Sequence, residues 1–159
     1  MKAASLATLK KELKLRSHEE LQEMVLRLGR FKTENKELLT YLLFEAEDEA
    51  YYIQQVQEFI SQSFEEINRN SPFYIRKSIR KILRMTKKYS RYSSEKETEV
   101  ILLLHFCKCL QSFRPSITTQ PALLRLFQNQ KNLIEKKGEG LHEDLRYDYS
   151  QQLQKLTLP

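Results

Sequence analysis

The chain has 159 residues, of which 40% are hydrophobic and 30% charged, and it contains three glycines, four prolines and two cysteines. A chain of this length can bury a core without metal or disulfide staples, and so little glycine and proline argues against a loop-rich sandwich or barrel. The formal net charge of +6 comes from one segment, because residues 71–92 carry eight basic and no acidic side chains. We therefore expect one helical domain over residues 1–159 with a local basic surface.

The first quarter of the chain is expected to form three short helices. Leucines at helical spacing indicate a helix over residues 5–14. Ser17 and Glu20 have the spacing of a capping box that starts the second helix, and Gly29 is expected to end it. A third helix is expected over residues 34–44. The side chains expected to be buried in these helices are Leu21, Met24, Val25, Leu28, Leu38, Leu39, Tyr41, Leu42 and Leu43.

Three short runs in this region resemble the start of small uncharacterised helical proteins from bacteria. The runs are Lys10-Lys11-Glu12-Leu13-Lys14, Ser17-His18-Glu19-Glu20-Leu21 and Lys36-Glu37-Leu38-Leu39. The resemblance covers roughly the first quarter of the chain. It implies a helical fold and a bacterial protein, and it implies no activity.

The next two predicted helices have opposite charge. A helix over about residues 48–68 carries an apolar stripe and belongs to a stretch with seven acids and no Lys or Arg between residues 45 and 68. Ser71 is a good N-cap and Pro72 suits the first helical position, so a second helix is expected over residues 72–92. The two helices are expected to pair antiparallel, which would bring the acids near the cations.

The helix over residues 72–92 divides cleanly at 100° per residue. Ile75, Ile79 and Ile82 fall together on an apolar side. Eight cations occupy one continuous arc on the other side, where they repel one another unless a bound anion, an acidic protein or solvent compensates them. These candidate partner-binding residues are Arg76, Lys77, Arg80, Lys81, Arg84, Lys87, Lys88 and Arg91.

The stretch over residues 94–113 is the predicted centre of the fold. From Val100 to Leu110 only His105 and Lys108 interrupt the apolar run, and a helix that is apolar on nearly every side needs neighbours on nearly every side. The run is too short to cross a bilayer, which takes about 20 apolar residues. Ser94 is expected to begin this helix with a second capping box.

Two more helices are expected after this one, separated by joints near residues 113–121 and 138–140. The fold class is therefore all-α: a compact bundle of seven or eight helices around a buried central helix. An irregular α–α superhelix built from successive helical hairpins is the alternative.

Residues that carry chemistry form no recognisable catalytic or metal pattern. Cys107 and Cys109 lie about 200° apart on one helix, so they should not bond to each other, and two thiols without a framework indicate a reducing, cytoplasmic location. His105 and Cys109 offer one two-ligand face with no second pair of ligands. No phosphate-binding glycine loop, nucleophile elbow or H-E-x-x-H motif occurs. We expect no cofactor and no metal.

These observations lead to a non-enzymatic interaction module that uses the basic helix 72–92. Nucleic acid is the best single named partner, and an acidic protein or an anionic membrane surface is also open. The alternative is a protein-binding scaffold or a homodimer whose basic face is compensated by the acidic helix 48–68, or simply solvated. An enzyme without a recognisable motif is the third interpretation.

Overall fold

The computed structural model describes residues 1–158, and within them the fold is all-α, as predicted, with eight α-helices and no strand. The chain divides into two compact units, Met1–Phe44 and Glu45–Pro159. Both joints expected near residues 113–121 and 138–140 lie inside the second unit. The expectation of one domain over residues 1–159 stays a prediction.

The first unit contains three helices, α1 (Leu6–Leu13), α2 (His18–Phe31) and α3 (Thr33–Thr40), followed by a short π-helix at Tyr41–Glu45. The predicted capping box is present, because the Ser17 hydroxyl accepts from the Glu20 amide and the Glu20 carboxylate accepts from the Ser17 amide.

Gly29 does not end α2, which continues to Phe31, and Gly29 has no positive φ. It is buried instead, and an added Cβ would lie 2.9 Å from Cδ1 of Leu39. The glycine therefore serves the close approach of α2 and α3 rather than a left-handed turn.

Most of the side chains predicted to be buried in the first unit are not buried, so this prediction is wrong for them. Only Gly29 and Tyr41 are buried there, while Leu21, Leu38 and Leu39 are half-buried. A periodic apolar pattern shows which residues share a helix face, but the face is buried only where a partner covers it. The predicted core residues that are exposed are Met24, Val25, Leu28, Leu42 and Leu43.

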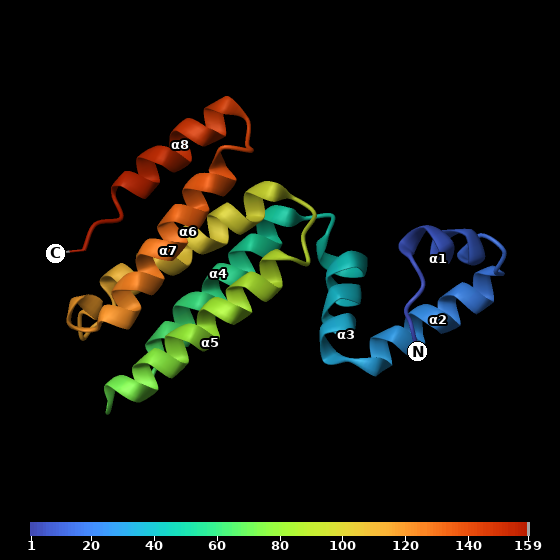
Figure 1. Ribbon diagram of the computed structural model, residues 1–159, viewed down its shortest axis with the longest axis horizontal. Coiled ribbons are helices and arrows are strands. Elements are labelled where there is room, and N and C mark those ends of the chain that lie inside the picture. Colours follow the sequence, from blue (N-terminus) through green and yellow to red (C-terminus); the bar gives the residue numbers. More distant parts are fainter. Residues whose placement is uncertain (159) are drawn as a thin grey trace. The chain divides into compact units, whose positions relative to one another are not determined.

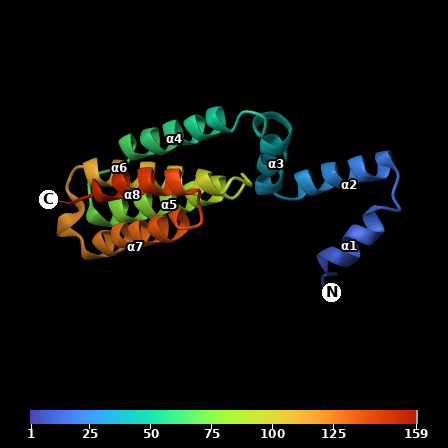
Figure 2. The ribbon, with the colours of Figure 1, turned by 90° about the horizontal axis from the view of Figure 1, so that it is seen from above.

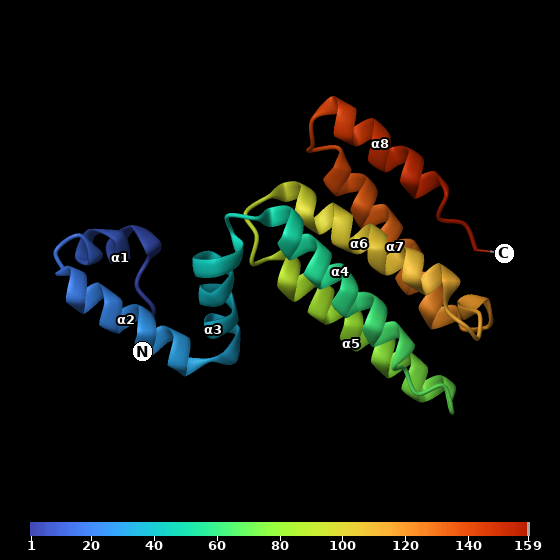
Figure 3. The ribbon, with the colours of Figure 1, turned by 180° about the vertical axis from the view of Figure 1, so that it is seen from behind.

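The second unit is a bundle of five helices built around α6 (Lys96–Ser112). The other four are α4 (Glu49–Glu65), α5 (Pro72–Ser90), α7 (Pro121–Gly138) and α8 (Glu143–Gln154), and α6 packs on all of them. Figures 1 and 3 show α4 and α5 side by side, with α7 and α8 beyond α6 on the opposite side. The predicted central position of this helix is confirmed.

The core of this unit is the apolar surface of α6. Leu102, Leu103 and Phe106 are completely buried. The Phe64 ring from α4 packs against Phe106, with ring centroids 5.5 Å apart, and lies 6.0 Å from the Phe113 ring. These contacts hold α4 against the central helix, as expected for large aromatic side chains in a core.

A side chain caps the start of α5, whereas the start of α6 has no side-chain cap. Ser71 caps α5 through the Tyr74 amide and Pro72 takes the first position, as predicted. Ser94 does not cap α6, which starts after Glu95 without a side-chain cap. The hydroxyls of Ser93 and Thr98 donate instead to the carboxylate of Glu49 at the start of α4.

The joint at residues 138–140 turns the chain from α7 into α8. Neither of its glycines has a positive φ, and α7 includes Gly138. The leucine stripe of α8 is half-buried, and Leu156 beyond it is fully buried. The C-terminal stripe therefore packs on its own chain, since α8 lies against α7 and α6.

Candidate functional site

The basic surface is the outer side of α5, and we define it by the eight predicted cations. Ile75, Ile79 and Ile82 point into the core with at most 5% of their surface exposed, which fixes the rotation of the helix. Since the cations lie opposite, all of them reach the surface. Arg76, Lys87 and Lys88 are half-exposed, and the exposed ones are Lys77, Arg80, Lys81, Arg84 and Arg91.

Two of the acids expected to face this surface accept hydrogen bonds from other residues. Glu49 accepts the hydroxyls described above, and Glu66 accepts a hydrogen bond from Gln62. The expected ion pairs of Glu65 and Glu66 with Arg76 and Lys77 are not formed within residues 1–158.

Six of the eight cations make neither an ion pair nor a side-chain hydrogen bond in the described chain. Arg76 is bound differently, since its guanidinium donates to the side-chain oxygen of Gln120 at 3.3 Å. The six cations are Lys77, Arg80, Lys81, Arg84, Lys87 and Arg91.

Four of these cations line one open groove of about 430 Å³ between α5 and α6. Arg80, Arg84, Lys87 and Arg91 recur along the helix at intervals of three or four residues, so they follow a single stripe about 16 Å long. Leu83 forms the apolar part of the lining. At 100° per residue, these four cations occupy the half of the predicted arc that also contains Arg76.

Glu99 is the one acid among the groove residues, and it was not among the predicted site residues. Its carboxylate lies 2.6 Å from the ammonium of Lys137 on α7, so it already has a cationic partner. No sequence signal pairs Glu99 with Lys137, because they are brought together only by the packing of α7 on α6.

Two tyrosines lie near the ends of the basic surface. About half of the surface of Tyr74 is exposed, and its ring contacts the Phe73 ring edge-on. Tyr92 packs against Tyr89, with centroids 6.0 Å apart. Tyr74 is therefore the more exposed of the two aromatic side chains.

A second polar cluster lies between α4 and α6. The Ser61 hydroxyl is 2.7 Å from Nε2 of His105, and the Cys109 sulfur is 3.6 Å from the same nitrogen. Burial lowers the pKa of His105 and raises that of the Cys109 thiol. A thiol held protonated is a poor nucleophile, so this cluster fits interhelical packing rather than covalent catalysis.

Cys107 lies about 200° around α6 from both His105 and Cys109. Both thiols are free, and burial raises the pKa of Cys107 to about 12. Across residues 1–158, no three His, Cys, Asp or Glu side chains are grouped so that they could hold a metal ion. In the same range, none of the helices combines the length and apolar character that crossing a membrane requires.

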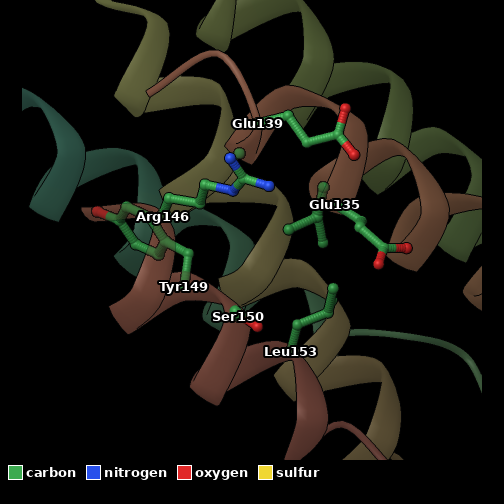
Figure 4. Close-up of a pocket in the computed structure, with 8 residues that line it drawn as sticks. Glu135, Glu139, Arg146, Tyr149, Ser150 and Leu153 are labelled. Carbon is green, nitrogen blue, oxygen red and sulfur yellow. The ribbon is translucent and has the colours of Figure 1, made fainter. Parts of the chain in front are cut away.

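A small pocket of about 140 Å³ lies between α7 and α8. Figure 4 shows the Arg146 guanidinium extending toward the side of α7 that carries Glu135 and Glu139. The pocket is below the roughly 300–1,000 Å³ typical of ligand sites, and its charges are mixed.

No protein-family model matches this chain, and searches of the curated proteins and of the solved structures also return no match. The resemblance of the first quarter to bacterial helical proteins stays a prediction.

Proposed function

We propose that this protein is a non-enzymatic interaction module that binds the phosphate backbone of nucleic acid through the basic surface of α5. The proposal is supported by one observation above the others. Six cations of this surface have no carboxylate partner in the described chain, and four of them line a single groove. Their mutual repulsion is relieved when a polyanion takes the place of water and salt ions.

The residue types fit phosphate better than an isolated carboxylate. Three of the four groove cations, Arg80, Arg84 and Arg91, are arginines, whose planar guanidinium donates two parallel hydrogen bonds to phosphate oxygens. Cations in a row along a helix match a ligand that repeats its charge along a line. Such contacts position a protein on nucleic acid without reading its sequence, so little sequence preference is expected.

The alternative, a protein-binding scaffold with a self-compensated basic face, requires ion pairs between α4 and α5. For Arg84, Lys87 and Arg91 those pairs do not form, because Glu45, Glu47 and Asp48 make no ion pair in residues 1–158. The unpaired cations therefore favour an external polyanion over internal compensation.

Charge reversal within the groove tests the proposal. Arg80→Glu combined with Arg84→Glu should abolish most binding to duplex and single-stranded nucleic acid at low salt. The control is Arg125→Glu combined with Lys136→Glu on α7, two exposed cations that change the net charge equally. Circular dichroism and thermal melting should show that both variants are folded.

The control variant should keep most of the wild-type affinity, losing only the small contribution of overall charge. An equal loss in both variants would show that binding follows net charge alone and would remove the groove from the account. Binding of an acidic protein but of no nucleic acid would select the other partner class.

A further inference from the structure

The first unit leaves its two longest apolar stripes uncovered. Leu6, Leu9 and Leu13 share one face of α1, and every one of them is at least 45% exposed. On α2, the residues Met24, Val25, Leu28 and Phe31 share one face, and they are 39–78% exposed. A helix whose apolar stripe is exposed gains little from folding, since most helix stability in proteins comes from packing that stripe.

The two stripes do not cover each other. Figure 2 shows α1 diverging from α2 away from their connecting turn. The turn is held by the capping box at Ser17 and by an ion pair between Arg16 and Glu20 at 3.5 Å. The hairpin is therefore fixed at its closed end and open along its apolar side.

The exposed area matches what a stable dimer needs. The exposed fractions of the seven stripe residues add to about four whole side chains, or roughly 400 Å² of apolar surface at about 100 Å² each. A standard interface buries about 800 Å² per partner, of which about 60% is apolar. Leu15, in the turn between α1 and α2, adds further exposed apolar surface.

The charges of the first unit do not select a strongly acidic or basic partner. Residues 1–44 carry nine basic and six acidic side chains, and both signs occur on α1 and on α2. A surface of mixed charge and low net charge repels its own copy only weakly. A second copy also supplies the same two open stripes in equal amount.

We infer that the α1–α2 hairpin is a self-association site, in which two copies bring their four apolar stripes together as an intermolecular four-helix bundle. Four amphipathic helices can bury narrow stripes around one axis, which two diverging helices cannot. The arrangement is isologous, so each copy contributes the same residues to the contact. This site is separate from the basic surface and goes beyond the function proposed above.

Sedimentation equilibrium of the full chain, without nucleic acid, tests the inference. The wild type should be a dimer, with a melting temperature that rises with protein concentration. Leu9→Glu combined with Leu28→Glu should raise the dimer Kd at least about 100-fold, because two carboxylates would be buried without partners. Because no nucleic acid is present, a failure to dimerise would contradict the self-association site and would leave the nucleic-acid proposal unaffected.

Tyr147→Glu is the matched control, because Tyr147 is 65% exposed on α8 in the other unit. This variant should dimerise like the wild type. If the glutamate pair prevents folding, Leu9→Gln combined with Leu28→Gln should still weaken the dimer measurably. A monomeric wild type at all concentrations, or a dimer that the hairpin variants leave intact, would overturn the inference.

Discussion

The carboxylate of Glu99 on α6 lies 2.6 Å from the ammonium of Lys137 on α7, at the edge of the groove lined by Arg80, Arg84, Lys87 and Arg91. This ion pair keeps the one acid of the groove from neutralising the arginines of α5. About a quarter of the Glu99 side chain is still exposed. Its negative charge therefore lowers the positive potential of the groove.

Glu99→Gln should therefore bind nucleic acid more tightly than the wild type. The change removes a negative charge from the groove and frees Lys137, while a partly exposed ion pair contributes at most about 1 kcal/mol to stability. Fluorescence anisotropy at low salt should show a lower Kd, with the largest difference at the lowest salt. An unchanged or weaker affinity would place the bound phosphates away from Glu99.

Leu103→Ala should lower the free energy of unfolding by about 2–5 kcal/mol, the usual cost of removing a fully buried leucine side chain. Leu103 has no exposed surface, and its helix packs against four others. The measurement is urea unfolding followed by circular dichroism. Leu26→Ala, at a side chain 52% exposed on α2, provides the comparison and should cost far less. Equal losses in both variants would contradict the central position of α6.

The centre of the fold could be predicted from the sequence because its signal does not depend on what surrounds it. Between Val100 and Leu110 only His105 and Lys108 interrupt the apolar run, so nearly every face of the helix had to be enclosed. The stripes of α1 and α2 have an equally clear period, yet they are exposed. Periodicity identifies a face that needs a partner and says nothing about whether the same chain supplies it.

His105 should make the second unit less stable as the pH falls. Burial lowers its pKa from the ordinary 6.5, so below that pH the unfolded chain binds more protons than the folded chain. Stability is therefore greatest above pH 6.5 and declines on acidification. His105→Gln should reduce the difference in unfolding free energy measured above and below pH 6.5, whereas His18→Gln, at an exposed position, serves as control. An unchanged pH dependence in His105→Gln would show that His105 is not the cause of the loss of stability at low pH.

Gly138→Ala should stabilise the protein by about 0.5–1 kcal/mol, because glycine is a poor residue inside a helix. Gly138 belongs to α7 without a positive φ, and an added Cβ would meet no atom within 4 Å. Thermal unfolding should show a raised melting temperature. A lower melting temperature would mean that the joint to α8 needs the freedom of glycine.

The basic surface could be predicted residue by residue, because it lies on one helix and follows the 100° rotation. The acidic residues beside this surface could not be predicted. Sequence proximity placed the acids of residues 45–66 beside the cations, whereas packing gives the groove its acid from Glu99. The link between Ser61 and His105 was missed for the same reason, since 44 residues separate them in the chain.

The most direct test of the central claim is the salt dependence of duplex binding by the wild-type protein between about 50 and 200 mM salt. If the four groove cations neutralise about four phosphates, log Kobs should fall against log salt with a slope near −3.6, at about 0.9 per phosphate. Duplexes of different sequence should give the same slope. No binding at the lowest salt, or a slope close to zero, would contradict the account.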